Sequence, residues 1–396
     1  MIIKPLIRDN IALNAHPRGC YENIVNQIKW VQTKDPIVNR PLNVLIIGGS
    51  SGYGLASRIA LAFNAKSYTY NVSFERPGSK RSTASAGYYN NLAFETLAKE
   101  QGIESDDFNG DAFSFETKEK VLSDFEVAGK KIDLLIYSVA SGIRIDPYTQ
   151  EKYVSTLKPI GQDFKGLSVD IAKKTIKEVI LDPASEEEIE NTRKVMGGED
   201  YLLWVKAIDE KGLFNQNAKS ITYTYIGSEL TYPIYKDGTI GNAKRDLEAA
   251  QTQIQEIMAK VDGEALISSS KTVVTKASVF IPTVALYGST LFKVMKLANT
   301  HESITQHKFR LFKDMVYGNQ RLLDDANLIR LDSFEMDPIV QEQVKELMAF
   351  TTTSDDLDAI DFDFFIQEFN QMNGFMIDGV DYNEDIDIES FNTSII

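Results

Sequence analysis

The sequence predicts an α/β fold built on a doubly wound parallel sheet. Short apolar runs alternate with amphipathic stretches of helical period between residues 42 and 140, which is the order of successive strand–helix–strand units. The first run leads straight into a glycine-rich turn, and the run over 132–139 is apolar almost throughout, as a strand covered on both faces requires. Such sheets have right-handed crossovers and bind ligands beyond the carboxyl ends of their strands, so we expect the site there.

The first strand, turn and helix are the most informative stretch of the chain. Residues 44–47 are all apolar, and an amphipathic helix begins near Leu55. The turn between them consists of Gly48, Gly49, Ser50, Ser51, Gly52, Tyr53 and Gly54. Glycines let a pyrophosphate approach the backbone, and the helix N-terminus offers free N–H donors. The glycine spacing resembles that of short-chain dehydrogenases and predicts a dinucleotide site; the alternative is a glycine-rich turn without a ligand.

The second strand, over residues 67–73, indicates which dinucleotide binds. It ends in Phe74 and Glu75, and Glu75 follows Gly54 by 21 residues, at the place of the acidic residue that binds adenosine ribose. A carboxylate accepts hydrogen bonds from both ribose hydroxyls and repels a 2′-phosphate, so we expect NADH rather than NADPH. The neighbouring Arg76 would favour the phosphate instead, and an ordinary surface carboxylate is the alternative for Glu75.

The next units continue the same alternation. Helical periodicity covers 89–102 and 115–128. Asp111 and Ala112 follow a short polar strand, where an adenine-contacting side chain is usual in this fold. The buried strand that comes next opens into small residues, Ala140-Ser141-Gly142, which let a cofactor lie close to the backbone.

Beyond residue 140 the pattern is less regular. We expect one enlarged Rossmann-type domain over 1–396, with a core of about 42–300, an insertion over 145–215 that covers the site, and a C-terminal helical elaboration over 300–396. Residues 167–181 predict a hairpin, and Ser185 predicts the N-cap of a helix with glutamates in its first turn. A later helix should run to Lys260, with Thr239 or Asn242 as its cap.

Composition and charge exclude several classes of function. The chain has 396 residues, of which 57 are acidic and 42 basic, and its net charge of −15 disfavours nonspecific binding to nucleic acid. The single cysteine, Cys20, permits no intrachain disulfide and fits the cytoplasm, and with three scattered histidines we expect no metal site. The first residues lack the apolar run of a signal peptide. The most apolar stretch, 277–292, predicts a buried helix rather than a membrane span.

Tyr235 and Lys244 are the candidate catalytic pair. Reduction of a carbonyl or an enoyl thioester needs a hydrogen-bond donor on the substrate oxygen and a cation that holds the cofactor and lowers the pKa of the donor. Tyr287 and Lys296 have the same separation, but on one continuous helix they would lie on opposite faces. Gly238 and its neighbours break the helix between Tyr235 and Lys244, so this pair can converge. A core or surface tyrosine is the alternative for Tyr235.

Motifs spread along the whole chain carry a family resemblance. They lie at residues 14–20, 48–53, 74–75, 89–94, 110–113, 195–200, 223–227, 238–241, 274–278 and 291–296, and eight residues separate Tyr235 from Lys244. In these positions the chain resembles the trans-2-enoyl-CoA reductase and enoyl-acyl-carrier-protein reductase family of the FabV type. The departures from that pattern are Gly142 in place of proline, Tyr88 and Tyr201 in place of tryptophan, and Val273 in place of leucine. They bear on the shape of the pocket and not on the reaction, because they remove no group that the reaction needs.

The resemblance implies a role for each site residue. It implies an NAD site lined by Gly48, Gly49, Ser50, Ser51, Gly52, Tyr53, Phe74, Glu75, Asp111, Ala112, Val139 and Ala140, and completed around the nicotinamide by Val273, Val274 and Thr275. Tyr225 would contact the substrate, Tyr235 would donate the proton and Lys244 would bind the cofactor. The implied reaction is the NADH-dependent reduction of the C2–C3 double bond of a trans-2-enoyl thioester, carried by CoA or by acyl carrier protein, in fatty-acid synthesis or short-chain acyl metabolism.

The resemblance also implies a monomer. Two other functions fit the residues: a short-chain-dehydrogenase-like reductase of ketones or 3-ketoacyl thioesters, and a non-catalytic NAD-binding regulator. Turnover of a 3-ketoacyl but not an enoyl thioester would favour the first, and NADH binding without turnover would favour the second.

Overall fold

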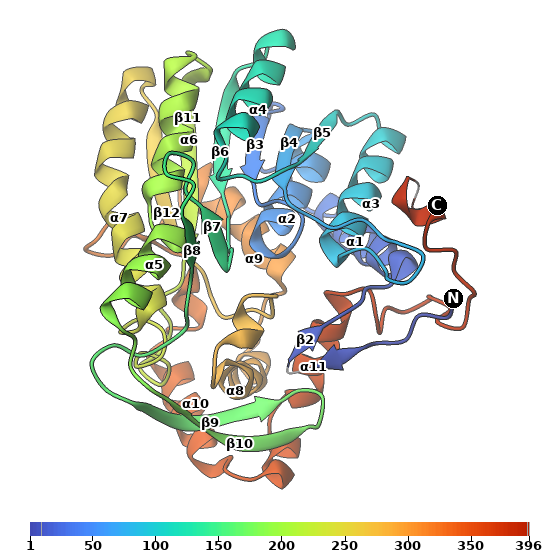
Figure 1. Cartoon of the computed structure of the whole chain (residues 1–396), viewed down its shortest axis with the longest axis vertical. Coiled ribbons are helices and arrows are strands. Elements are labelled where there is room, and N and C mark those ends of the chain that lie inside the picture. Colours follow the sequence, from blue (N-terminus) through green and yellow to red (C-terminus); the bar gives the residue numbers. More distant parts are fainter. Residues whose placement is uncertain (9, 394, 396) are drawn as a thin grey trace.

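A parallel sheet of seven strands runs through the middle of the described chain (Figure 1). The structure, a computed structural model, describes residues 1–8, 10–393 and 395. The strands are β3 (Asn43–Ile47), β4 (Tyr68–Ser73), β5 (Ser105–Asn109), β6 (Ile132–Tyr137), β11 (Phe214–Thr224), β12 (Glu264–Ser269) and β13 (Ile329–Arg330). Their order in the sheet is β13-β12-β11-β6-β3-β4-β5, and every pair is parallel. The chain therefore winds outward from β3 in both directions, which confirms the doubly wound sheet.

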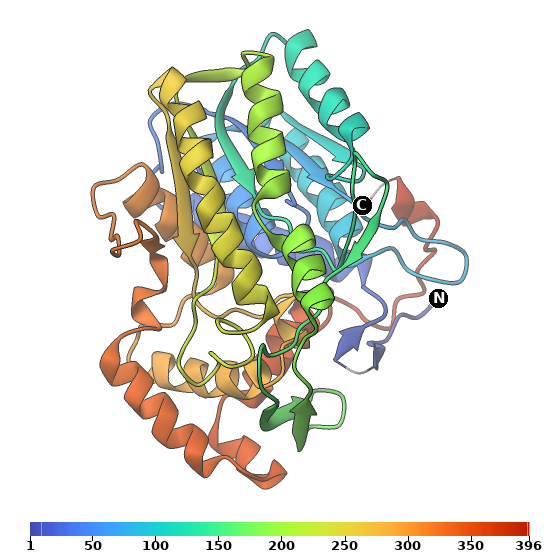
Figure 2. The ribbon, with the colours of Figure 1, turned by 60° about the vertical axis from the view of Figure 1, so that its left-hand side comes forward.

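Helices cover both faces of this sheet. One layer contains α1 (Pro17–Gln32), α2 (Gly52–Ile59), α3 (Ala86–Glu100) and α9 (Ile304–Arg310). The other contains α4 (Phe115–Val127), α6 (Glu199–Glu210) and α7 (Thr239–Met258), and Figure 2 shows α6 and α7 lying across the near face. On β3, Val44 and Ile46 pack into the first layer, and Leu45 and Ile47 pack into the second. Because successive side chains of a strand point to opposite faces, both sets must be apolar, and this gives the continuous apolar run.

A second group of elements lies in the lower half of Figure 1, below the sheet. It contains α8 (Val284–Leu297), α10 (Pro338–Phe350), α11 (Phe362–Gln371) and the hairpin of β9 (Phe164–Asp170) and β10 (Thr175–Leu181). Val169, Phe292, Phe365 and Phe369 are buried together in its core. The small hairpin of β1 (Ile7–Arg8) and β2 (Ile11–Ala12) packs against it. Among the described helices, none is long and apolar enough to cross a membrane.

Two local predictions in the segment before α6 are confirmed. The hairpin over 167–181 is present, with Thr175 paired to Asp170 across the turn. Ser185 caps α5 (Glu186–Met196) through a capping box with Glu188. The same segment contains the short antiparallel pair β7 (Ile143–Ile145) and β8 (Lys152–Val154).

Two predictions about helix boundaries are wrong. Neither Thr239 nor Asn242 caps α7, because Gly238 occupies the N-cap and the Thr239 hydroxyl instead donates to the carbonyl oxygen of Thr156 at 2.6 Å. Residues 277–292 do not form one helix. A 3₁₀ turn, Ser278–Phe280, comes first and α8 begins only at Val284. Pro282 explains the break, because its ring disfavours a helical residue before it and it has no N–H to donate.

Candidate active site

In the glycine turn after β3, Gly48, Gly49 and Gly54 have no room for a side chain. Gly48 has a φ of +92°, in the left-handed region that favours glycine, and its N–H donates to Val72 O at 2.8 Å. A Cβ on Gly54, in the first turn of α2, would overlap the carbonyl oxygen of Gly48 and lie 3.1 Å from the Cα of Gly49. The N-terminus of α2 is thereby held directly against the turn. This is the geometry in which backbone N–H groups can bind a phosphate.

Asn71 on β4 fixes the turn from the side. Its Oδ1 accepts from the N–H of Gly49 at 2.8 Å, and its Nδ2 donates to Asp107 Oδ1 at 2.6 Å. Asp107 is in turn paired with Arg58, a fully buried residue of α2, at 2.6 Å. A buried charge pair therefore supports the amide that orients the turn. Asn71 belongs to none of the motifs above, although a polar side chain within an aromatic, β-branched strand is a signal in the sequence.

Glu75 lies at the carboxyl end of β4, as predicted, with its carboxylate facing the glycine turn. Its Oε1 accepts from the hydroxyl of Ser50 at 2.6 Å, and its Oε2 accepts from the hydroxyl of Ser85. A Cβ on Gly87, in the first turn of α3, would overlap this carboxylate. The carboxylate is therefore fixed in place and already accepts hydrogen bonds from two hydroxyl groups. The adjacent Phe74 is 79% exposed, so its ring is free to contact a ligand.

Asp111 and Ala112 lie beyond the end of β5 and are held by buried groups. Asp111 accepts from the N–H of Phe113, and the carbonyl oxygen of Ala112 accepts from Lys118 Nζ at 2.8 Å and from Trp204 Nε1 at 3.0 Å. Val139 and Ala140 follow β6 and are at least partly exposed. Both pairs therefore lie at the same edge of the sheet as the glycine turn.

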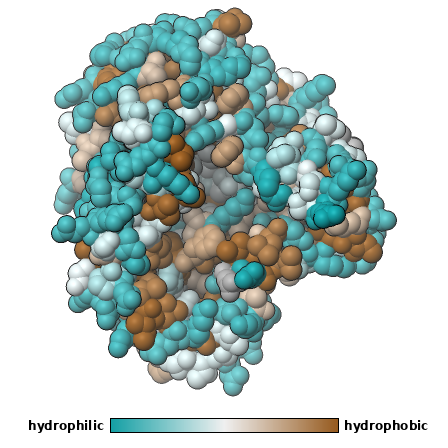
Figure 3. Space-filling model, in the orientation of Figure 1, coloured by the Kyte–Doolittle hydropathy of each residue, from teal (hydrophilic) through white to brown (hydrophobic). Residues whose placement is uncertain are grey.

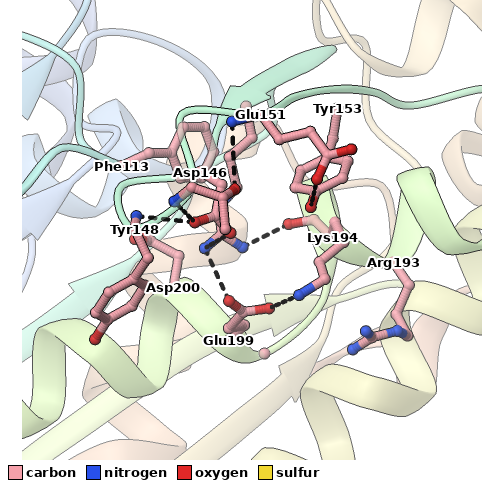
Figure 4. Close-up of polar contacts among 12 residues, drawn as sticks. Phe113, Asp146, Tyr148, Glu151, Tyr153, Arg193, Lys194, Glu199 and Asp200 are labelled. Carbon is pink, nitrogen blue, oxygen red and sulfur yellow. Dashed lines mark hydrogen bonds and ion pairs between the residues drawn. The ribbon is translucent and has the colours of Figure 1, made fainter.

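After β6 the chain continues into β7, where Arg144 anchors it. Its guanidinium is buried, and it donates to the carbonyl oxygen of Lys194 at 2.7 Å and to Glu199 Oε1 at 3.2 Å. Figure 4 shows Asp146, Lys194 and Glu199 converging in this region. A Cβ on Gly142 would meet no described atom within 4 Å, so packing does not require the glycine that replaces the family's proline.

Residues 271–275 bring the other half of the sheet next to the glycine turn. The hydroxyl of Tyr53 donates to the carbonyl oxygen of Lys271 at 2.8 Å. A Cβ on Gly52 would lie 3.6 Å from Thr275 Cγ2. Val273 and Val274 are buried between these contacts. The fold thus places the predicted nicotinamide-end residues beside the predicted phosphate turn.

Tyr225, Tyr235 and Lys244 lie near the carboxyl end of β11. The rings of Tyr225 and Tyr235 meet edge to face, with centroids 4.9 Å apart. Among the described residues the hydroxyl of Tyr235 has no hydrogen-bond partner, and burial raises its pKa. Lys244 Nζ donates to the carbonyl oxygen of Tyr223, at the end of β11, at 3.3 Å, and burial lowers its pKa to about 8 against the opposing effect of Glu248.

The rival pair, Tyr287 and Lys296, separates as predicted. Both lie on α8, but the Tyr287 hydroxyl donates to Glu335 at 2.8 Å whereas Lys296 pairs with Asp361 at 3.0 Å. The two side chains therefore point to different neighbours and do not form a site.

Two charged residues near the tyrosines were missed by the sequence analysis. Lys308 is fully buried, donates to the Ser270 hydroxyl at 2.7 Å, and lies 3.6 Å from the ring centroid of Tyr223. Glu335 is also fully buried and accepts from Tyr225. Both reach the site from segments without a motif, so no sequence signal pointed to them. In the described part of the chain there is no group of three histidine, cysteine or acidic residues that could hold a metal.

The comparisons with known proteins agree with this geometry. The sequence profile described as the trans-2-enoyl-CoA reductase catalytic region matches residues 82–317, and the profile described as the NAD(P)H binding domain of trans-2-enoyl-CoA reductase matches residues 2–80. The chain belongs to the trans-2-enoyl-CoA reductase family. This confirms the resemblance that the separated motifs indicated.

Relatives match along nearly the whole chain. The chain is 46% identical to an enoyl-[acyl-carrier-protein] reductase [NADH] of Teredinibacter turnerae and 41% identical to a trans-2-enoyl-CoA reductase [NADH] of Ruminiclostridium cellulolyticum, over 98% of both chains in each case. The crystal structure of Clostridium acetobutulicum trans-2-enoyl-CoA reductase in complex with NADH superposes with a TM-score of 0.96, at 40% identity, and covers 99% of each chain.

A third profile, described as the enoyl reductase FAD binding domain, matches residues 323–386. This segment is fully described and contains β13, α10 and α11, and the buried Phe362, Phe365 and Phe369 of α11 pack it onto α8. Within it there is no glycine-rich turn between a parallel strand and a helix like the one at Gly48–Gly54. The residues present do not fit a flavin, and we derive no step through one.

Proposed function

We propose that this chain is an NADH-dependent reductase that saturates the C2–C3 double bond of trans-2-enoyl thioesters, carried by CoA or by acyl carrier protein. The observation that carries the proposal is the buried Tyr235, whose hydroxyl has no partner among the described residues. It lies against Tyr225, and Lys244 of α7 contacts the end of the same strand. A free donor, with a cation held at the carboxyl end of β11, supports stabilisation of a developing oxyanion.

The cofactor that fits the described cradle is NADH. The N–H groups of Gly48–Tyr53 and the N-terminus of α2 suit the pyrophosphate, and Glu75 suits the adenosine ribose hydroxyls. Asp111, Ala112 and the exposed ring of Phe74 suit the adenine. Val139, Ala140 and Val273–Thr275 would surround the nicotinamide. When bound, the cofactor supplies the hydride that is added at C3.

The protein groups act on the charge that the addition creates. Negative charge develops on the thioester oxygen as an enolate forms, and Tyr235 donates a hydrogen bond to that oxygen. Burial raises the pKa of Tyr235, whereas the sequence led us to expect a cation to lower it. The hydroxyl therefore keeps its proton at neutral pH and remains a donor. Lys244 would orient the cofactor ribose and add positive charge. A proton from solvent then reaches C2, and the enolate becomes the saturated thioester. Figure 3 shows a hollow between the sheet and the lower helices with apolar residues on its rim, which suits an acyl chain.

We further propose that the enzyme is a cytoplasmic monomer of fatty-acid synthesis or short-chain acyl metabolism, without metal or nucleic-acid partners. The relatives carry both kinds of name, for acyl carrier protein and for CoA, which supports both carriers equally. The charge of −15 supports the absence of a nucleic-acid partner.

The experiment that tests the proposal is the oxidation of NADH by the purified protein with crotonyl-CoA, with acetoacetyl-CoA in a parallel reaction. We expect turnover of crotonyl-CoA and little of acetoacetyl-CoA. Turnover of acetoacetyl-CoA without turnover of crotonyl-CoA would identify the protein as a ketone reductase instead. Tight NADH binding without turnover of either thioester would replace it by a regulator.

A further inference from the structure

Two tyrosines lie side by side in the site, with ring centroids 4.9 Å apart, and the surroundings of their hydroxyls differ. The hydroxyl of Tyr235 has no hydrogen-bond partner within the described chain, whereas the hydroxyl of Tyr225 lies 2.7 Å from Thr272 Oγ1 and 3.2 Å from Glu335 Oε1. Both hydroxyls belong to phenols with the same intrinsic chemistry. Something other than residue type must therefore decide which of them donates to the substrate.

Glu335 is the centre of a buried cluster of donors. Its side chain is fully buried. Oε1 accepts from the hydroxyls of Tyr287 at 2.8 Å, Thr272 at 3.0 Å and Tyr225 at 3.2 Å, and Oε2 accepts from the N–H of Thr272. Burial raises the pKa of Glu335, and the hydrogen bonds from the N–H of Thr272 and the hydroxyl of Tyr287 oppose that shift by favouring the ionised form. In that form the carboxylate only accepts, so it satisfies these donors.

The C-terminal segment holds this carboxylate in place. Glu335 directly follows the 3₁₀ turn Leu331–Phe334, and its carbonyl oxygen accepts from Gln341 Nε2 at 2.7 Å. Asp332 of the same turn accepts from the Ser269 hydroxyl at 2.8 Å, at the end of β12. The segment that does not fit a flavin thus delivers one charged group to the site.

The hydrogen-bond directions in the cluster follow from its donors and acceptors. Each hydroxyl has one proton. Donated to Glu335, the Tyr225 proton fills the 3.2 Å contact; donated to Thr272, it fills the 2.7 Å contact and Thr272 donates onward to the carboxylate. In either arrangement that proton is used inside the cluster. The hydroxyl of Tyr225 then offers the site a lone pair and no proton.

We propose that Glu335 is a positioning residue that holds the proton of Tyr225 and so leaves Tyr235 as the tyrosine that donates to the thioester oxygen. This inference rests on the proposed function of the site. The carboxylate acts through Tyr225 and touches no substrate atom itself. Through Glu335, the segment of residues 323–386 would thus help to select the proton donor of the reaction.

Glu335→Gln tests the idea because it keeps the shape and reverses the hydrogen bonds. The N–H of Thr272 needs an acceptor, so the glutamine oxygen should face it and the new NH₂ group should face Tyr225 and Tyr287. Tyr225 then has no acceptor on residue 335, and whenever Thr272 donates to it, its own proton points into the site, where it competes with Tyr235. We expect kcat/KM for crotonyl-CoA to fall about tenfold to about a hundredfold, as misplacement of a reacting group does, while the Kd of NADH changes by less than about twofold.

A double-mutant cycle separates this role from a structural one. If Glu335 acts through Tyr225, then Glu335→Gln in a Tyr225→Phe background should cause no further loss of kcat/KM. Asp332→Asn is the matched control, since it removes a buried charge in the same turn whose partners in the described structure, Ser269 and Arg330, are not tyrosines. Its effect should add to that of Tyr225→Phe. An unchanged kcat/KM in Glu335→Gln, or losses that add to that of Tyr225→Phe, would overturn the inference.

A measurement without turnover distinguishes failure of this inference from failure of the proposed function. In protein labelled with carbon-13 at the tyrosine Cζ, the NMR resonance that disappears in Tyr225→Phe reports the hydrogen bonding of that hydroxyl. We expect this resonance to shift in Glu335→Gln even if the wild type reduces no enoyl thioester. A resonance that stays in place refutes the role of Glu335 whatever the activity. If Glu335→Gln does not fold, Thr272→Val removes the other acceptor of the Tyr225 proton and leaves Glu335 to hold it. The Tyr225 resonance should then stay in the hydrogen-bonded range, and a shift to that of a free hydroxyl would overturn the inference.

Discussion

Gly54→Ala distinguishes the packing of the glycine turn from helix propensity, because packing predicts a lower stability of the folded protein and propensity predicts a higher one. Gly54 lies in the first turn of α2 with an ordinary negative φ, so propensity alone predicts that alanine stabilises the helix by about 1 kcal/mol. The new Cβ would, however, overlap the carbonyl oxygen of Gly48 and lie 2.8 Å from its carbonyl carbon and 3.1 Å from the Cα of Gly49. Comfortable carbon contacts begin at about 3.5 Å. Since the clashing atoms are backbone, α2 must shift away from the turn.

The expected net effect is destabilisation. Overpacking of this kind costs about 1–3 kcal/mol, which exceeds the gain from propensity. The shift also moves the amides that would bind the pyrophosphate, so we expect the Kd of NADH to rise by at least about tenfold, equal to about 1.4 kcal/mol. Denaturant unfolding gives the first quantity and fluorescence titration with NADH gives the second.

Gly102→Ala is the matched control for this experiment. It adds the same methyl group at a position with φ of +66°, where a Cβ would meet no described atom within 4 Å. Only backbone strain of about 1–2 kcal/mol is expected there, with NADH binding unchanged. The reasoning fails if Gly54→Ala binds NADH as tightly as the wild type, or if Gly102→Ala weakens NADH binding to the same extent.

Three further predictions concern the reacting and cofactor-binding side chains. Tyr235→Phe should lower kcat by about a hundredfold or more, the usual contribution of a positioned proton donor, with the Kd of NADH unchanged in titration; near wild-type turnover would show that another group donates. Glu75→Ala should shift the ratio of kcat/KM for NADH over NADPH toward NADPH by about tenfold or more, because one like charge near the 2′-phosphate is removed, and an unchanged ratio would sink the assignment. Burial lowers the pKa of Lys244 from 10.5 to about 8, so the ammonium is present below about pH 8 and lost above it. The pH profile of kcat/KM should therefore fall as the pH rises through about 8, and Lys244→Met should lack this limb.

The sequence predicted well those features whose signals are local. The hairpin over 167–181, the capping box at Ser185 and the glycine turn after β3 each depend on residues within a few positions of one another. The choice of Tyr235 and Lys244 over Tyr287 and Lys296 also needed only helix geometry, and the second pair does contact different partners. Their catalytic roles remain predictions that the experiments above test.

The features that sequence reasoning missed depend on tertiary packing. Glu335 meets Tyr225 across 110 residues, and nothing in its own neighbourhood marks it as a site residue. Lys308 is a buried cation beside aromatic rings, which its sequence context, on a helix with other charged residues, does not reveal. The cap of α7 was misassigned because the hydroxyl of Thr239 bonds to Thr156, a partner that no local rule supplies.

The measurement that tests the central claim most directly is the position of the label in the product made from crotonyl-CoA and NADH that is deuterated at its transferable hydrogen. The account predicts butyryl-CoA with deuterium at C3 and a solvent-derived hydrogen at C2, and far less product from Tyr235→Phe. Crotonyl-CoA recovered intact under conditions where NADH binds would contradict the proposed reaction. So would deuterium at the carbinol carbon of 3-hydroxybutyryl-CoA, formed from acetoacetyl-CoA and the labelled NADH, if crotonyl-CoA is not reduced.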